Sequence, residues 1–181
     1  MIKDIHNLYA KSSLMYSSQD IQTSLDRMAK EIEAQMSDKD PVVVCVMTGG
    51  LVTTGHLVTR LNFHLQMDYV HATRYQGEME GGQLEWIARP RTNLEGRTVL
   101  IVDDILDAGI TLAEIKKAFL EQGAKEVYTA VLIDKIRERP AEGLQKADFV
   151  GLNIKDHFIF GFGLDYKGYL RNTSGIYQVN A

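Results

Sequence analysis

Short, unbroken runs of apolar residues recur along this chain, separated by longer stretches with helical spacing. The clearest runs are 42–47 and 99–102; residues 126–133 are expected to form the next strand, and another is expected from Asp148. Unbroken apolar runs of this length are typical of strands that are buried on both faces of a sheet. Such strands with helices between them indicate an α/β fold.

Three stretches place apolar residues every three or four positions, as amphipathic helices do. The first follows Asp20, a suitable N-terminal cap, the second follows Gly50, and the third starts at Thr111 and ends at Gly123. Residues 1–19 show no such spacing and are expected to be irregular. The spaced positions are Ile21, Leu25, Met28, Ile32 and Met36, then Leu51, Gly55, Leu57, Val58 and Leu61, and finally Leu112, Ile115, Phe119 and Leu120.

A polar stretch rich in glycine lies between two predicted strands. Residues 66–73 alternate apolar and polar positions and are expected to form a strand, whereas residues 74–91 show little periodicity. The second segment is therefore expected to be a mobile loop with a short hairpin around residues 84–88. Such a loop either closes over reactants or is an inert surface hairpin.

The turn between the strand at 99–102 and the helix at Thr111 carries the most distinctive chemistry. It contains Asp103, Asp104, Asp107 and Gly109. Free N–H groups and the dipole at a helix start favour phosphate, and the lysine-bearing phosphate loop of nucleotide triphosphatases is absent. The carboxylates suggest a ligand with hydroxyl and phosphate groups, with Mg²⁺ to offset the negative charge.

The carboxylates of this turn are open to two other interpretations. In the first, the carboxylates are a solvated strand end and a helix N-terminal charge, although three of them within five positions repel one another without a cation nearby. In the second, the pair belongs to a response-regulator receiver domain, in which an Asp-Asp pair opens the domain. Only 181 − 104 = 77 residues follow Asp104 here, fewer than the ~100–150 of a typical domain.

Composition excludes several classes of protein. The chain has 181 residues, enough for one domain with a real core, and its net charge of −4 gives no basic surface for nucleic acid. No apolar run approaches the ~20 residues of a membrane helix, and there is no signal-peptide pattern. The single Cys45 lies in an apolar strand, where a packing role is expected. These features favour the cytoplasm.

The segment Val-Leu-Ile-Val-Asp-Asp-Ile-Leu-Asp-Ala-Gly-Ile-Thr at 99–111 resembles the phosphoribosyl pyrophosphate (PRPP) motif of type I phosphoribosyltransferases. Its Asp-Asp-Ile-x-Asp-x-Gly-x-Thr form is similar to that of the hypoxanthine-guanine branch. The resemblance implies a mainly parallel twisted sheet flanked by helices, in one domain with its core at about 38–147. A small hood is implied at about 1–19 and 148–181.

This resemblance implies purine salvage, in which the phosphoribosyl group of PRPP passes to N9 of hypoxanthine or guanine. Asp103 and Asp104 match residues that bind the ribose hydroxyls, and Asp107 lies beside N7 of the purine as the candidate catalytic base. The 5′-phosphate would be bound by Asp107, Ala108, Gly109, Ile110 and Thr111.

Other landmarks of the family follow in order. Met47-Thr48-Gly49-Gly50 matches the pyrophosphate loop, which can carry a non-proline cis peptide, but Thr48 stands where a lysine is common. Arg171 matches a residue that contacts pyrophosphate, and Asp165 one that binds the Mg²⁺ ion. In the mobile loop, Arg74-Tyr75 replaces a usual Ser-Tyr pair, so only the role of the tyrosine carries over.

The purine site is implied by a second group of residues. Lys135 matches the lysine that donates to the purine 6-oxo group, which adenine lacks. Phe158 matches the ring that stacks on the purine, and Ile105 is expected on the opposite side. The backbone at Ile159 and the region of Asp165 would bind the edge of the base.

Several alternatives stay open at this stage. The base could be xanthine, adenine or orotate, or the chain could be a regulator that kept this fold to sense PRPP. Family members are commonly dimers or tetramers, so a homo-oligomer is expected. The substrates would be a purine base and PRPP, without a nucleic acid or membrane partner.

Overall fold

The structure is a computed structural model that describes residues 2–74 and 84–180. The described residues form four helices and two β-sheets, one of six strands and one of three. In chain order the elements are α1 (Ile2–Lys11), β1 (Ser13–Tyr16), α2 (Ser18–Met36), β2 (Val42–Met47), α3 (Gly50–Val58), β3 (Gln66–Arg74), β4 (Leu84–Ala88), β5 (Thr98–Leu106), α4 (Ile110–Glu121), β6 (Glu126–Ile136), β7 (Phe149–Lys155), β8 (Ile159–Phe160) and β9 (Ile176–Gln178).

The six-stranded sheet confirms the predicted α/β fold. Its order is β4-β3-β2-β5-β6-β7, and every neighbouring pair is parallel except the antiparallel pair of β3 and β4. From β2 the chain proceeds outward to β3, and from β5 it proceeds the opposite way to β6 and β7. The order therefore reverses between β2 and β5, and in such sheets ligands bind beyond the carboxyl ends of the strands at this point.

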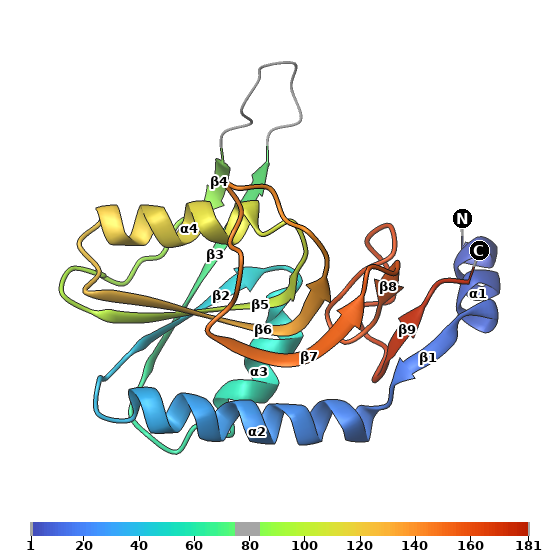
Figure 1. Cartoon of the computed structure of the whole chain (residues 1–181), viewed down its shortest axis with the longest axis horizontal. Coiled ribbons are helices and arrows are strands. Elements are labelled where there is room, and N and C mark those ends of the chain that lie inside the picture. Colours follow the sequence, from blue (N-terminus) through green and yellow to red (C-terminus); the bar gives the residue numbers. More distant parts are fainter. Residues whose placement is uncertain (1, 75–83, 181) are drawn as a thin grey trace.

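Helices cover both faces of this sheet because its strands are apolar on both sides. Val42 and Val44 belong to a buried cluster with Ile115 and Phe119 of α4, whereas Val43 belongs to a second buried cluster with residues of α2 and α3. Figure 1 shows α4 on one face and α2 and α3 on the other. Cys45 is buried in the same strand, as its apolar neighbours predict.

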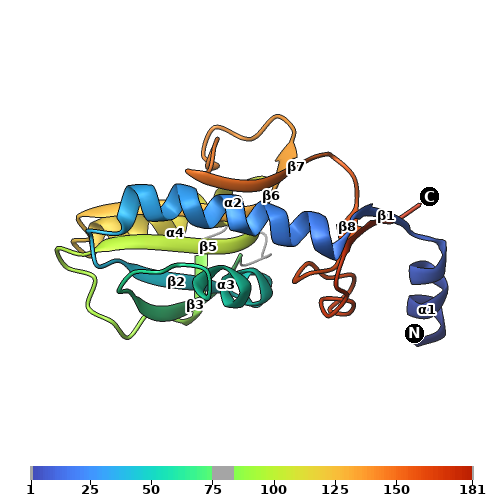
Figure 2. The ribbon, with the colours of Figure 1, turned by 90° about the horizontal axis from the view of Figure 1, so that it is seen from below.

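The three-stranded sheet joins the two ends of the chain. Its order is β1-β9-β8, with antiparallel pairs, and it lies with α1 at one end of the molecule, facing the carboxyl ends of the parallel strands (Figures 1 and 2). The expectation that residues 1–19 are irregular is wrong, because they contain α1 and β1. The expected hood boundary at 148 is also too early, since β7 pairs with β6 in the large sheet.

Two local expectations about the helices need correction. Helix α2 is capped by Ser17, not Asp20: the Ser17 side chain accepts from the Asp20 N–H, and the Asp20 carboxylate accepts from the Ser17 N–H. This reciprocal pair is a capping box. In α4, Leu112, Ile115 and Phe119 are buried as predicted, but Leu120 is 46% exposed because it lies on the outer side of the last turn.

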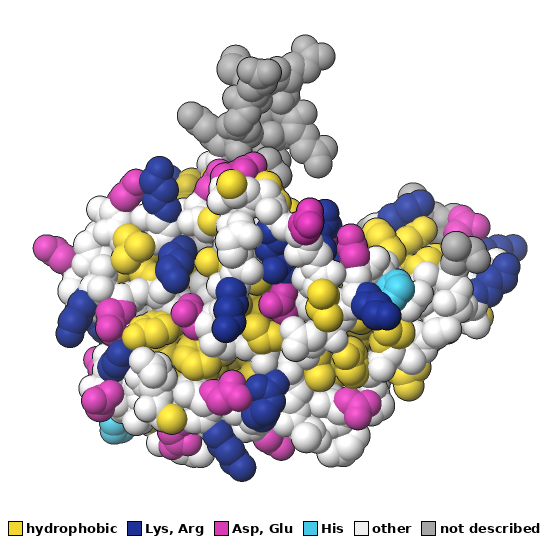
Figure 3. Space-filling view, viewed as in Figure 1, with side chains coloured by type: hydrophobic (Ala, Val, Ile, Leu, Met, Phe, Trp, Pro, Cys, Tyr) yellow, Lys and Arg dark blue, Asp and Glu magenta, His cyan; other side chains and the backbone are white. Residues whose placement is uncertain are grey.

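Charged side chains are mixed over the described surface that Figure 3 shows. Lys and Arg alternate there with Asp and Glu, so this face lacks the broad basic surface that nucleic-acid binding uses. Within residues 2–74 and 84–180, none of the helices combines the length and the apolar character needed to cross a bilayer.

Candidate active site

A cavity of about 450 Å³ lies where the strand order reverses. Its walls come from the loop after β2, the end of β5 with the loop that follows, and residues of the loop between β8 and β9. These segments are far apart in the sequence, and the carboxyl edge of the sheet brings them together. The lining residues are Val46, Met47, Thr48, Gly49, Ala72, Asp103, Asp104, Ile105, Asp107, Ala108, Gly109, Ile110, Thr111, Leu112, Asp165 and Arg171.

The loop between β5 and α4 has the geometry of an anion-binding site. Helix α4 begins at Ile110 after Gly109, which adopts φ +76° and provides no side-chain cap. The first N–H groups of a helix have no partner within the helix, and residues 109–112 line the cavity. A Cβ at Gly109 would overlap the backbone of Leu144, so the close approach as well as the left-handed backbone requires glycine.

The strand before this loop is longer than the apolar run predicts. β5 continues through Asp103 and Asp104 to Leu106, because Asp103 and Ile105 still pair with β6. The first two carboxylates are therefore held on a strand, and only Asp107 lies in the turn. The helix also starts one residue earlier than expected, at Ile110.

Burial and mutual repulsion act on the two strand carboxylates. Removal from water raises the pKa of Asp103 well above its ordinary value, and the neighbouring charge of Asp104 raises it further. Burial also raises the pKa of Asp104, which is only 8% exposed. The Arg171 guanidinium, with Nη1 4.0 Å from Asp104 Oδ2, offsets part of this effect. The free protein thus holds two carboxyl groups whose charged forms are under-compensated.

Replacing Asp103 with asparagine is expected to stabilise the ligand-free protein at neutral pH. A carboxyl group with a raised pKa in the folded state destabilises the fold as pH rises through that pKa, and asparagine carries no charge while still accepting the Asp104 N–H. Differential scanning calorimetry should show a higher Tm, by about 2–4 °C for each kcal/mol of repulsion removed. The gain should shrink at acid pH, where Asp103 is protonated; an equal gain at both pH values would contradict this account.

The loop after β2 closes the opposite side of the cavity. Its Met47–Thr48 peptide bond is cis, as the resemblance to the pyrophosphate loop allows. A Cβ at Gly49 would overlap the Asp104 carboxylate, so this position lets the loop approach the end of β5. Thr48, Gly49 and Arg171, the three residues expected at the pyrophosphate, all line the same cavity.

Arg171 and Asp165 bring the loop between β8 and β9 to this cavity. Arg171 Nη2 lies 2.7 Å from Asp165 Oδ1, and Nη1 donates to the Gly163 carbonyl. The other Asp165 oxygen, Oδ2, accepts from the Gly168 N–H at 2.7 Å. Both side chains are thus held in place in the free protein.

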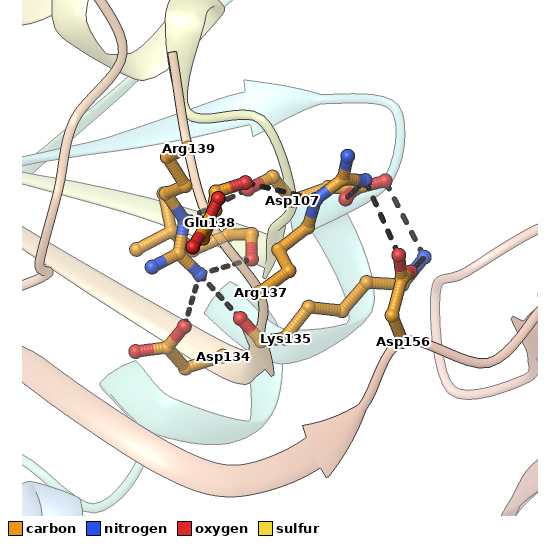
Figure 4. Close-up of polar contacts among 8 residues, drawn as sticks. Asp107, Asp134, Lys135, Arg137, Glu138, Arg139 and Asp156 are labelled. Atoms are coloured by element: carbon orange, nitrogen blue, oxygen red, sulfur yellow. Dashed lines mark hydrogen bonds and ion pairs between the residues drawn. The ribbon is translucent and has the colours of Figure 1, made fainter. Parts of the chain in front are cut away.

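The candidate base, Asp107, belongs to a network of two cations and two carboxylates (Figure 4). Asp107 Oδ1 lies 2.8 Å from Arg137 Nη1, and Asp107 Oδ2 lies 3.4 Å from Lys135 Nζ. Asp156 contacts the same two cations, at 3.2 Å from Lys135 and 3.7 Å from Arg137. The contact with Asp107 raises the pKa of Arg137. The network thus connects the loop between β5 and α4 to the ends of β6 and β7.

Arg139 holds the backbone that carries this network. Its guanidinium donates to the carbonyls of Leu106, Asp107 and Lys135, and it also pairs with the Asp134 carboxylate. The side chain is almost completely buried, so its hydrogen bonds are shielded from water. Arg139 therefore fixes the backbone of the loop between β5 and α4 against the end of β6.

The residues expected at the purine are only partly gathered in the cavity. Ile105 and Asp165 line it, whereas Lys135, Phe158 and Ile159 lie outside its lining. Phe158 is 59% exposed and contacts the Tyr166 ring edge-on, with 5.7 Å between ring centres. Ile159 is buried in β8, where its backbone pairs with Gln178.

The expected mobile loop is described only at its ends. Arg74 is the last residue of β3 and pairs with Leu84. Residues 84–88 are not a short hairpin of their own, as expected, but one strand, β4, that pairs antiparallel with β3. Tyr75 and the rest of 75–83 lie outside the described residues, so closure of this loop stays a prediction.

Sequence reasoning missed the roles of Arg137, Arg139 and Asp156. The two arginines follow the predicted strand at 126–133 and could be noticed as charges, but no local pattern pairs them with Asp107. Ile136 pairs with Lys155 across β6 and β7, so the next residue of each strand, Arg137 and Asp156, emerges side by side. Only the register of the two strands reveals this contact.

Known proteins share both the sequence pattern and the fold. The family model for the phosphoribosyl transferase domain matches residues 15–167. The chain is 32% identical to the hypoxanthine-guanine phosphoribosyltransferase of Bacillus subtilis over 160 residues, 88% of each chain. It is 31% identical to the hypoxanthine-guanine-xanthine phosphoribosyltransferase of Tritrichomonas foetus over 159 residues, 88% of this chain and 86% of the other.

A solved structure extends the similarity to three dimensions. The crystal structure of a hypoxanthine phosphoribosyltransferase from Staphylococcus aureus matches with a TM-score of 0.89 and 27% sequence identity. The match covers 97% of this chain and 94% of the other. The shared fold therefore extends over nearly the whole chain.

Proposed function

Because the chain belongs to the phosphoribosyltransferase family, in its hypoxanthine-guanine branch, we propose that it transfers the 5-phosphoribosyl group of PRPP to N9 of a 6-oxopurine. Hypoxanthine would give IMP and guanine GMP, with release of pyrophosphate, so the enzyme serves purine salvage. The observation that carries this proposal is the meeting of the PRPP motif, the pyrophosphate loop and Arg171 in one cavity.

The loop from Asp103 to Thr111 would bind the phosphoribosyl part of PRPP. Asp103 and Asp104 present carboxylate oxygens that accept hydrogen bonds from the two ribose hydroxyls. The 5′-phosphate would lie at the start of α4, where the N–H groups after Gly109 and the Thr111 hydroxyl are available as donors. Ala108 and Ile110 contribute backbone to the same loop.

Thr48, Gly49 and Arg171 would hold the pyrophosphate. Since Thr48 has no charge, Arg171 is the single cation among the described residues that line the cavity, together with four aspartates. A ligand with several phosphate charges fits such a site only when a cation accompanies it. This charge balance supports Mg²⁺ as the cofactor.

The residues present fit a magnesium ion held mainly by substrate. Within the described residues, no cluster of three His, Cys, Asp or Glu side chains is placed to hold a metal ion. Mg²⁺ commonly uses one or two carboxylates together with substrate phosphates and water, and Asp165 is the carboxylate we assign. When bound, the ion offsets the charge that develops on the departing pyrophosphate.

Lys135, Ile105, Phe158 and Ile159 would bind the purine. The Lys135 ammonium requires an acceptor, which the 6-oxo group of hypoxanthine or guanine supplies. Phe158 and Ile105 would hold the two faces of the ring, and the Ile159 backbone its edge. Because Phe158 is exposed in the free protein, purine binding would cover it.

The chemistry needs a base and a dry site. Breaking the bond from ribose C1′ to pyrophosphate leaves positive charge on the sugar ring, as in other glycosyl transfers. Purine N9 attacks C1′ and the N7 proton passes to Asp107, which lies at the end of the phosphate loop. Closure of the segment at 74–91 over the reactants would exclude water.

An assay with PRPP, Mg²⁺ and each of five bases tests the proposal. Hypoxanthine and guanine should be consumed with release of pyrophosphate. Adenine, which presents an amino group in place of the 6-oxo acceptor for Lys135, and orotate, a pyrimidine without the N7–H that Asp107 would take, should not. The result with xanthine shows whether this chain also accepts the third base that is named for the Tritrichomonas foetus protein. PRPP binding by calorimetry without turnover on any base would instead identify a PRPP-sensing regulator and contradict the proposal.

We also propose that the protein acts in the cytoplasm as a homo-oligomer. Large apolar side chains are exposed around β3 and the start of α3, which supports contact with another copy. They are Leu51, Met67, Tyr69 and Ile87. Sedimentation velocity should show a dimer or a tetramer, and a monomer at micromolar concentration would contradict the assembly.

A further inference from the structure

The carboxylate assigned as the base has both of its oxygens occupied in the free protein. Asp107 Oδ1 accepts from Arg137 Nη1 at 2.8 Å, and Oδ2 lies against Lys135 Nζ at 3.4 Å. A general base needs an oxygen within reach of the proton that it takes. Each oxygen keeps a second lone pair, but a cation at the same oxygen competes with the incoming N–H. Asp107 can therefore accept a proton from a purine most readily at the oxygen that a cation leaves.

The contacts of Lys135 and Arg137 with Asp107 differ in length and in geometry, and this difference indicates which of them breaks first. The Lys135 contact is longer, and the same ammonium also reaches Asp156 Oδ1 at 3.2 Å. An ammonium is a compact charge with three donors on a flexible stem, so it can turn toward a new acceptor. The guanidinium of Arg137 is planar and holds its carboxylate at a shorter distance.

The backbone fixes Arg137 in this position. It directly follows the last residue of β6, and Asp156 directly follows the last residue of β7, two strands in parallel register. Asp156 Oδ2 lies 3.7 Å from Arg137 Nη1, the same atom that contacts Asp107, and adds a second negative charge beside the guanidinium. Figure 4 shows the Arg137 guanidinium next to Asp107, with Asp156 across from them.

We propose that Arg137 is a positioning residue. It keeps its hydrogen bond to Asp107 Oδ1, while purine binding draws the Lys135 ammonium away from Asp107 Oδ2. This inference rests on the proposed function. The 6-oxo group of the purine takes a donor of Lys135, and Oδ2 is left facing the N7–H. The N9 lone pair then forms the bond to C1′, the C1′–oxygen bond breaks with its electron pair leaving on pyrophosphate, and the N7 proton passes to Oδ2.

A double-mutant cycle tests this assignment. Arg137→Ala should lower kcat with hypoxanthine by about 10- to 100-fold, the effect expected for loss of one charge-assisted hydrogen bond. The KM for PRPP should change little, because Arg137 does not line the cavity. Arg137→Lys should restore part of kcat. In an Asp107→Asn background, Arg137→Ala should cause no further loss, because the two residues act as a unit.

The matched control is Arg97→Ala. Like Arg137, Arg97 is a partly exposed arginine that pairs with an aspartate, Asp40. It precedes β5 at the amino ends of the parallel strands, away from the cavity, so kcat should stay unchanged. Thermal unfolding of each variant shows whether it is folded. If the wild type is active, either of two results would overturn this inference but not the proposed function. One is a kcat that falls less than twofold in Arg137→Ala, and the other is a loss from Arg137→Ala in the Asp107→Asn background equal to its loss in the wild type. A wild type that does not consume PRPP would overturn the proposed function and this inference together.

Discussion

Replacing Asp107 with asparagine is expected to lower kcat for hypoxanthine and PRPP by about 10²–10⁴-fold, the usual range for removal of a general base. Asparagine has nearly the same shape and still offers an oxygen to Arg137, so the loop should keep its conformation. It cannot take up the N7 proton. Steady-state release of pyrophosphate, measured with both substrates at saturation, gives the ratio of kcat values.

Binding measurements separate this chemical role from damage to the phosphate loop. The N–H groups at the start of α4 are backbone groups, so PRPP affinity measured by calorimetry should change only a few-fold in Asp107→Asn. A kcat equal to that of the wild type would assign proton transfer to another group. Loss of PRPP binding together with activity would show that Asp107 supports the loop instead.

Replacing Lys135 with alanine is expected to weaken hypoxanthine binding by about 10- to 100-fold, the loss that accompanies one hydrogen bond to a charged donor. The Lys135 side chain is only 11% exposed, so water replaces its contacts poorly. PRPP affinity should change little, because Lys135 does not line the cavity. The KM for each substrate, measured with the other at saturation, tests both statements.

A matched lysine provides the control for this prediction. Lys39 is partly buried and pairs with a carboxylate, that of Glu126, as Lys135 pairs with its aspartates. Glu126 is the first residue of β6, so Lys39 lies at the opposite end of this strand from Lys135. Lys39→Ala should leave both KM values unchanged. If Lys135→Ala weakened PRPP and hypoxanthine equally, the residue would serve the loop as a whole and not the purine.

The sequence predicted those parts of the fold that depend on local pattern. The apolar run at 42–47 corresponds to β2, and the spacing of Leu112, Ile115 and Phe119 to the buried side of α4. The first nineteen residues were misjudged because their structure depends on distant partners. β1 pairs with β9 at the other end of the chain, and the Tyr9 ring of α1 packs against Phe160 and Tyr177.

The same distinction applies to the candidate site. The loops at 47–50 and 103–111 could be recognised because each is a continuous segment between a strand and a helix. The network around Asp107 could not, since Arg137 and Asp156 meet only through the register of β6 and β7. Asp103 and Asp104 were placed in a turn because apolarity ends at Val102, whereas backbone pairing with β6 continues to Leu106.

Arg139 has a consequence for how base selectivity can change in this scaffold. One guanidinium donates to the carbonyls of Leu106, Asp107 and Lys135, so the residues proposed to contact the 6-oxo group and to take the proton are held by the same side chain. A substitution that shifts the backbone of one is therefore expected to displace the other. Phe158 is exposed and receives no hydrogen bond from Arg139, so changes at the proposed stacking position are expected to leave this arrangement in place.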